Sequence, residues 1–283
     1  MYGKLKQFGR SMRHKQVTKC AVGAFAFYLY FRFHISREMD DGNRPDFTKN
    51  EAWYDIKILT DGTRNNTKEM GKQTYTDNVR EIFRDLKIAA SHFGHWGRVS
   101  GPVELEFNEV SPDLIRILGE LPWCLCWLIV VLFVKKSSYT SVAGNWDPKN
   151  QDARYSTKLP LKAIKAMAGF DEADGLHFNP RTACEPPREL SNKIFPWIED
   201  EIEKVFQTND IDSNTRITAV SVLRLWAKLR IIILQDAAAM FVLHPGRVDH
   251  PFLKLPIFRD VLFLVSFFHI LMLMICFASG FFY

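Results

Sequence analysis

The sequence predicts a mainly α-helical protein with one small β element. Apolar residues recur at helical spacing in several segments, and the longest segment, residues 216–243, contains neither glycine nor proline. Only residues 53–60, WYDIKILT, have the composition of a strand. The chain has 283 residues, of which 47% are hydrophobic and 24% charged, so it can bury a core in one large or two moderate domains.

In the first half of the chain, three helices follow from local signals. Residues 20–35 are apolar and aromatic over about four turns, which predicts a core helix that ends in the acidic loop MDDGNRPDF. Residues 74–90 place their apolar side chains mostly on one face, and Thr76 or Asp77 would cap the first turn. Residues 111–118 begin with a Ser-Pro-Asp cap, which predicts the start of another helix.

The second half predicts three more helices. Residues 159–170 form a short helix that Gly169 stops. Residues 189–206 form a helix that Pro196 bends. Residues 216–243 repeat apolar side chains at helical spacing and form the longest helix.

Positive charge is concentrated at the beginning of the chain. Residues 1–19 contain four Lys, two Arg and one His but no acid, in a protein with a formal net charge of +5. Such a segment fits a polyanion partner or a solvated end. The five cysteines have no CxxC spacing and no secretory context, so we expect an intracellular protein without disulfides, metal or cofactor.

Four residues suggest phosphodiester chemistry. His95 and Arg98 are one helical turn apart and can face one anion, while Trp146 and Tyr155 follow in GNWDPKNQDARY. A tyrosine hydroxyl can attack a phosphodiester if an arginine binds the non-bridging oxygens, a histidine assists proton transfer and an indole N–H donates a hydrogen bond. Each residue alone is compatible with an ordinary surface or packing role, and only their order and spacing point to this site.

That series, HWGR, then LG with NW, then Tyr155, resembles the catalytic motif of tyrosine recombinases. The flanking blocks RHKQVTKCAVGAFAFYLYFRFH, NEAWYDIKIL, LPLKAIKAMAGF and LRLWAKLRIIILQDAAAMF resemble the domain shared by fungal Crypton recombinases and the yeast centromere-binding subunit of the inner kinetochore. The resemblance covers residues 4–258. It implies a tyrosine recombinase-like fold, a nuclear protein and duplex DNA as the partner.

The spacing of the motif identifies an anomalous segment. Arg98 and Tyr155 are 57 positions apart, whereas the family has a little over thirty. Removing the 25 residues Glu120–Gly144 would leave 32 positions between Arg98 and Tyr155 and would join ILG directly to NW. We therefore hypothesise a retained intron, with a true loop insertion as the alternative. Uniform transcripts that keep this segment would contradict the hypothesis.

The resemblance also implies roles for individual residues. Tyr155 would be the nucleophile, Arg98 the phosphate clamp, His95 the acid or base, and Trp146 a phosphate-contacting donor. Lys4 or Lys6 matches the general-acid lysine, with Lys15 as an alternative.

The family's first catalytic arginine would precede residue 1, so we expect a truncated gene. Losing that hydrogen-bond donor would lower the rate of strand cleavage by a factor of roughly 10²–10³. We therefore expect DNA binding without efficient recombination, and an active integrase is the alternative. A tyrosine-linked adduct with suicide DNA substrates would contradict this expectation.

The expected DNA contacts are mainly to the phosphate backbone of double-stranded DNA. A basic arm supplies Lys4, Lys6, Arg10, Arg13, Lys15 and Lys19, and the helix after Tyr155 supplies Lys158, Lys162 and Lys165. Arg224, Lys228 and Arg230 add positive charge to a mixed polar side of the longest helix. A homodimer is an open expectation.

A membrane protein is the alternative from another class. Val261–Tyr283 has 23 residues without a charge, long enough to cross a bilayer as a C-terminal anchor. Leu121–Val134 is also uncharged but falls short of the required length. We accordingly expect a recombinase-like DNA-binding domain over residues 1–258, with the insertion at 120–144, and an apolar tail over 259–283.

Overall fold

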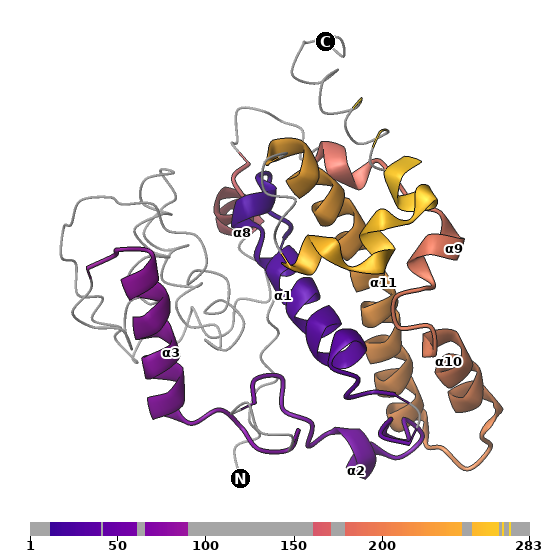
Figure 1. Cartoon of the computed structure of the whole chain (residues 1–283). Helices are drawn as coiled ribbons and strands as arrows, with labels where there is room; N and C mark the ends of the chain where they lie inside the picture. The colour runs from indigo at the N-terminus through magenta and orange to yellow at the C-terminus, as the bar shows by residue number, and fades with distance from the viewer. Residues whose placement is uncertain are drawn as a thin grey trace. The chain divides into compact units, whose positions relative to one another are not determined.

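A computed structural model describes residues 12–40, 42–60, 66–89, 161–170, 179–244, 251–265, 268 and 272 (Figure 1). The chain divides into two compact units. The first unit comprises Met1–Val22 and Met70–His177, and the second unit comprises Gly23–Glu69 and Phe178–Tyr283. The elements of the described residues are helices, which confirms a mainly α protein.

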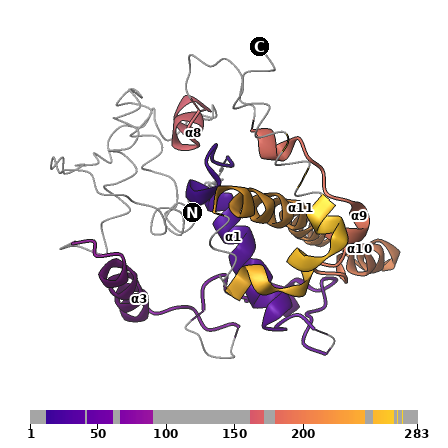
Figure 2. The ribbon, with the colours of Figure 1, turned by 45° about the horizontal axis from the view of Figure 1, so that its top comes forward.

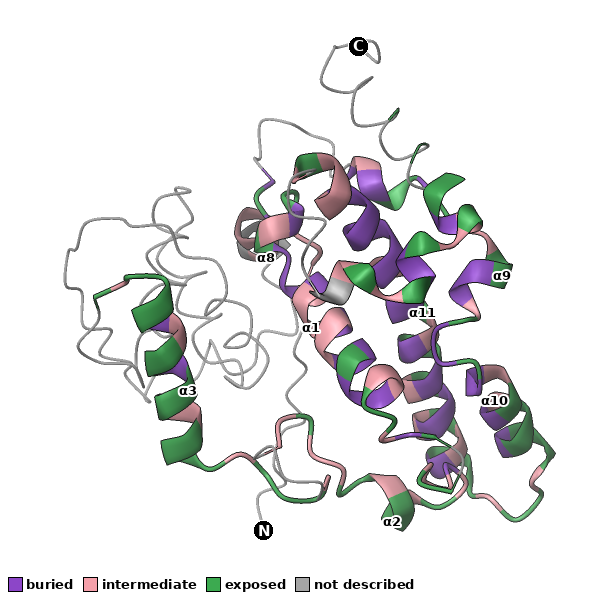
Figure 3. Ribbon diagram, viewed as in Figure 1, coloured by how far each residue is buried: buried purple, intermediate pink, exposed green. Residues whose placement is uncertain are grey.

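The second unit is built around one long helix, α11 (Ser213–Leu243). It begins three residues before the expected start because the Asp212 side chain accepts hydrogen bonds from the backbone N–H groups of Asn214 and Thr215, at 2.9 and 3.0 Å. Every residue from Ile233 to Ala239 is buried, so this part of the helix is covered on all sides (Figure 3). The long helix predicted from the sequence is confirmed.

A second core helix, α1 (Ala21–Tyr30), continues into a π-helical turn, Phe31–Ile35. Together they confirm the helix expected over residues 20–35. In both ribbon views α1 lies beside α11 (Figure 1, Figure 2). Phe33 stacks on Trp226 with ring centroids 4.9 Å apart, so the two helical segments contact each other directly.

An aromatic cluster completes this core. Phe47, Phe195, Trp197 and Trp226 contact one another with ring centroids between 5.3 Å and 6.3 Å apart. All four side chains are buried, and each such burial stabilises the fold by about 1.5–3 kcal/mol. Phe47 and Trp226 are far in sequence from each other and from the pair Phe195 and Trp197, so the cluster joins a loop, the segment before α10 and the middle of α11.

The helix expected over residues 189–206 is wrong as a single bent helix. The structure has two helices, α9 (Arg188–Ser191) and α10 (Ile198–Gln207), separated by an irregular segment. Pro196 lacks an N–H donor and disfavours helical backbone in the residue before it, and Phe195 has a left-handed φ of 49°. The proline therefore prevents one continuous helix, and the buried Phe195 ring fills the aromatic core.

The strand expected over residues 53–60 is also wrong. Trp53, the first residue of the expected strand, is the last residue of helix α2 (Asn50–Trp53). The only β pairing among the described residues is an antiparallel bridge between Thr60 and Glu69. The buried Arg32 explains the difference, because its guanidinium donates hydrogen bonds to the carbonyls of Lys57 and Ile58. These carbonyls are occupied by a side chain, where a strand would offer them to a partner strand.

The C-terminal part of the described chain packs onto the same core. Two short 3-10 helices, Pro251–Lys254 and Pro256–Arg259, lead to the buried Phe258. Phe263, from the expected apolar tail, is also buried and contacts Phe258 edge to face at 5.2 Å. Among the described residues, no helix combines the length and apolarity needed to cross a membrane. Residues 121–134 and most of the expected anchor at 261–283 lie outside the described residues.

In the first unit the structure describes α3 (Lys72–Asp85) and α8 (Leu161–Met167). The cap expected at Thr76 or Asp77 is wrong, because α3 begins earlier, after Gly71. Thr76 instead donates its hydroxyl to a backbone carbonyl within the helix. The short helix stopped by Gly169 is confirmed, and the helix expected over 111–118 lies outside the described residues.

Candidate nucleic-acid interface

The described part of the basic arm, residues 12–20, is folded and not merely a solvated end. It contains a short 3-10 helix, Val17–Lys19, whose last turn is closed by the hydrogen bond from the Cys20 N–H to the Val17 carbonyl at 3.0 Å. Val17 and Cys20 are buried, while Lys15 is exposed and Lys19 is the basic residue of the last turn. The apolar residues thus anchor the arm.

A backbone hydrogen bond docks this arm onto the end of α8. The Lys15 N–H donates to the Ala168 carbonyl at 2.7 Å. Ala168 follows the last residue of α8, where helix carbonyls lack a partner within the helix, so the arm satisfies one of them. Lys165 lies in the last turn of the same helix. This bond uses only the Lys15 backbone and does not involve its ammonium group.

The end of α8 has the geometry of a Schellman motif. The Phe170 N–H bonds to the Lys165 carbonyl and the Gly169 N–H to the Ala166 carbonyl, at 3.1 and 2.9 Å. Gly169 adopts a left-handed φ of 76°. The turn requires that conformation, and glycine adopts it without a Cβ clash.

Gly169 also makes room for the His14 ring. A Cβ atom at Gly169 would lie 2.8 Å from His14 Cε1, which is closer than carbon atoms approach in proteins. His14 Nδ1 accepts a hydrogen bond from the Gln16 N–H at 2.9 Å, which fixes the ring. Sequence reasoning missed His14 as a positioning residue, because nothing local to it indicates a contact with a residue 155 positions away.

The two docked segments carry only positive charge. Neither residues 12–22 nor residues 161–170 contain an acidic residue, and together they contain Arg13, His14, Lys15, Lys19, Lys162 and Lys165. Arg13 and Lys165 are partly buried, and the Lys162 side chain lies outside the described residues. An acid-free group of cations is the arrangement that phosphate contacts require.

The structure brings together four of the residues expected to bind DNA. Arg13, Lys15 and Lys19 of the arm and Lys165 of α8 belong to the first unit, and the Lys15–Ala168 bond connects their segments. The other expected site residues lie outside the described residues, and their roles stay predictions: Lys4, Lys6, Arg10, His95, Arg98, Trp146, Tyr155, Lys158.

Most arginines of the second unit serve the fold instead. Arg230, expected on a polar side of α11, is only 2% exposed. Its two terminal nitrogens contact the Glu199 carboxylate at 2.5 and 2.8 Å. Burial alone would raise the pKa of Glu199, but the Arg230 guanidinium outweighs it and holds that pKa below its usual range. Arg224 and Lys228 remain exposed on the same helix.

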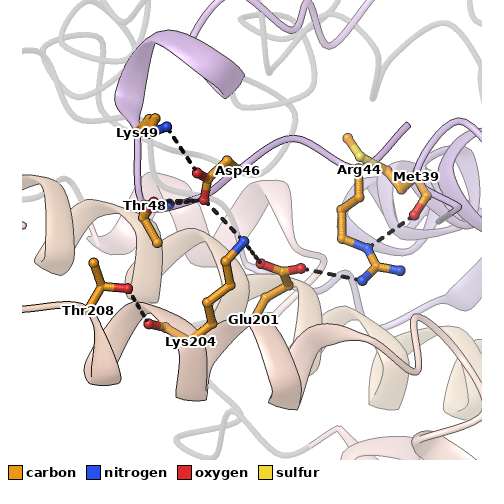
Figure 4. Close-up of polar contacts among 8 residues, drawn as sticks. All are labelled: Met39, Arg44, Asp46, Thr48, Lys49, Glu201, Lys204 and Thr208. Carbon is orange, nitrogen blue, oxygen red and sulfur yellow. Dashed lines mark hydrogen bonds and ion pairs between the residues drawn. The ribbon is translucent and has the colours of Figure 1, made fainter. Parts of the chain in front are cut away.

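A second polar network fastens residues 39–49 to α10 (Figure 4). Arg44 contacts Glu201 at 3.3 Å, and Lys204 contacts Asp46 at 3.2 Å. Burial would raise the pKa of Asp46, yet hydrogen bonds from Thr48 and Lys204 lower it below the usual range. These cations hold a loop in place, so they are not candidates for DNA contacts.

Metal ligation has no support in the described residues. They contain no group of three or more His, Cys, Asp or Glu side chains that could hold an ion. Cys20 and Cys184 are buried free thiols, and burial raises the pKa of the Cys184 thiol.

The fold and the docked arm define a mainly helical protein with an acid-free, positively charged segment. Residues 4–121 and 133–264 match the family described as centromere DNA-binding protein complex CBF3 subunit, domain 2. Since these ranges cover most of the chain, the protein belongs to that family. No curated protein and no solved structure matches it.

The match bears on two expectations from the sequence. The resemblance to the centromere-binding family is confirmed, whereas the link to Crypton elements and tyrosine recombinases stays a prediction. The matched ranges omit residues 122–132, which lie within the expected insertion at 120–144, and extend to residue 264.

Proposed function

We propose that this protein binds double-stranded DNA in the nucleus, mainly through the phosphate backbone, as part of a centromeric assembly. The family's description names a centromere DNA-binding complex, which supports the partner and the compartment. The observation that carries the proposal for this chain is the Lys15–Ala168 hydrogen bond, because it joins two acid-free basic segments into one surface. Phosphate contacts of this kind are largely independent of DNA sequence.

Strand cleavage is not part of the proposed function. The residues that would perform it, His95, Arg98, Trp146 and Tyr155, lie outside the described residues. A recombinase-like origin of the domain and a homodimeric state are finer parts of the same proposal.

The test is DNA affinity as a function of salt, measured by fluorescence anisotropy with a labelled duplex of arbitrary sequence. The observed binding constant should fall linearly with salt on logarithmic axes. Replacing Lys15 and Lys19 by glutamine should reduce the magnitude of that slope by about 2, since each phosphate contact contributes about 0.9. The backbone docking is retained, because the Lys15 N–H and not its side chain contacts Ala168.

Lys228→Gln provides a matched control, because it removes one lysine from α11 in the second unit. It should leave the slope and affinity unchanged. The proposal is wrong if the intact chain shows no salt-dependent binding, or if Lys228→Gln has the same effect per charge as the double variant.

A further inference from the structure

Helix α3 presents exposed cations toward its C-terminal end. Val79 and Phe83 are buried, whereas Arg80 and Arg84, one turn apart, are exposed. Lys87 follows just after the helix end and is exposed as well. Asp77 lies on the same side one turn before Arg80, whereas Glu81 and Asp85 each directly follow an arginine and project about 100° away from it. The helix therefore has a basic row that ends at its C-terminus.

Two cations of this row form no ion pair with any residue that the structure describes. Arg80 contacts Asp77 at 2.9 Å. Within the described residues, no carboxylate lies within ion-pair distance of the Arg84 or Lys87 side chain. The buried arginines of the second unit, such as Arg230, are in contrast paired with carboxylates. The end of the α3 row has the surplus of positive charge that a polyanion could neutralise.

The backbone at Lys87 is an independent observation. Lys87 has a left-handed φ of 55°, a conformation in which side chains other than glycine are strained. The Ile88 N–H bonds to the Phe83 carbonyl at 2.8 Å and the Lys87 N–H to the Arg84 carbonyl at 3.0 Å, so α3 ends in a Schellman motif. In α8 the equivalent position is Gly169. A role for the Lys87 charge would explain why lysine occupies a position where glycine fits better.

We propose that Arg84 and Lys87 form a second phosphate-contacting surface for duplex DNA, separate from the basic arm. The inference rests on the proposed function and adds to it contacts that the arm cannot supply. The competing explanation is local, because a cation near a helix C-terminus also interacts favourably with the helix dipole. That explanation predicts an effect on stability alone, so one substitution can separate the two.

The decisive variant of the full chain is Lys87→Gly, which removes the charge and relieves the left-handed strain. Thermal unfolding should give a melting temperature equal to or above that of the wild-type chain. The same protein should bind the labelled duplex several-fold more weakly, with a salt slope smaller by about 1. Arg84→Gln should produce a similar loss of affinity. Weaker binding by a protein that is no less stable cannot be explained by misfolding.

Arg37→Gly is the matched control. Arg37 also has a left-handed φ, 60°, and its side chain is 80% exposed, but it lies in the second unit. This variant also removes one cation and relieves a left-handed φ, and in addition it breaks an exposed ion pair with Asp40 at 3.7 Å; it should leave affinity and salt slope unchanged.

The outcomes distinguish failure of the second surface from failure of the proposed function. If the wild-type chain binds and the Lys15 and Lys19 variant weakens binding, but Lys87→Gly does not, the second surface is wrong and the proposed function stands. Equal losses for Lys87→Gly and Arg37→Gly would show a general charge effect and also overturn the second surface. A wild-type chain that does not bind duplex DNA would overturn both.

Discussion

Arg181 and Asp236 form an ion pair inside the core of the second unit, with Arg181 Nε and Asp236 Oδ1 2.6 Å apart. Their side chains are 4% and 1% exposed. Arg181 also donates to Asn179 at 3.2 Å, and the neighbouring Gln235 donates to the Cys184 carbonyl at 2.6 Å. Consecutive polar residues of α11 thus fasten residues 179–184 to a part of the helix that is otherwise apolar.

Removing only one member of this pair should be strongly destabilising. Arg181→Met would leave the Asp236 carboxylate buried without its cation, and we expect a loss of about 3–5 kcal/mol in the free energy of unfolding. Urea denaturation followed by circular dichroism measures this loss. The double variant Arg181→Met with Asp236→Leu should recover most of it, because neither charge is then buried alone. A double variant as unstable as the single one would contradict the explanation.

Stability should fall in mildly acidic solution because of His34. Burial, and then the positive charge of Arg230, lower the pKa of His34, while Asp40 partly opposes them. The ring stacks on Tyr30 at 5.0 Å, and Nδ1 accepts from the Phe195 N–H at 3.4 Å. The unfolded chain therefore binds the proton more readily than the folded one. The contribution of His34 is complete above its unfolded pKa of about 6.5 and is lost as pH falls toward the folded pKa.

His34→Asn should flatten this pH dependence, since an asparagine oxygen can replace Nδ1 as an acceptor and does not titrate. Urea denaturation at a series of pH values tests it. Paired carboxylates such as Glu199 also lose stability in acid, because their pKa values are lowered, but only at pH values below the histidine range. An unchanged slope between neutral and mildly acidic pH would contradict the role of His34.

Gly169→Ala should displace the basic arm. The left-handed φ costs about 1–2 kcal/mol for alanine, and the new Cβ would meet His14 at 2.8 Å. Gly42→Ala is the control, because Gly42 has a φ of 94° but a Cβ added there would meet no atom within 4 Å. Both variants should lose stability, but only Gly169→Ala should weaken duplex binding in the anisotropy measurement. Adding His14→Ala to Gly169→Ala should recover part of that loss if the ring contact is responsible.

The helices that depend on local signals could be predicted from the sequence. Residues 20–35, the short helix before Gly169 and the long helix α11 follow from apolar periodicity and from glycine or its absence. The start of α3 was wrong because a polar residue that can cap a helix can equally bond within one, as Thr76 does. The single helix through Pro196 was wrong because the sequence does not show that Phe195 is needed in an aromatic core.

The cations of the candidate site likewise fall into those that the sequence could identify and those that it could not. The sequence alone identified the basic arm and the lysines after Tyr155, because residue type and the absence of acids are visible without a fold. It could not distinguish Arg230, whose charge is neutralised inside the core, from Arg84 and Lys87, whose charges are not. That distinction depends on which carboxylates come near, and only the folded chain determines it.

A mainly helical protein of the centromere-binding family with a basic arm thus followed from the linear chain, since periodicity, composition and motif order are visible there. The folded chain was needed to show that Lys15 contacts Ala168, that Gly169 accommodates His14 and that Lys87 adopts a left-handed turn. The first two contacts join residues more than a hundred positions apart, and the third depends on how α3 ends. Interactions between distant residues are set by packing, which no local pattern encodes.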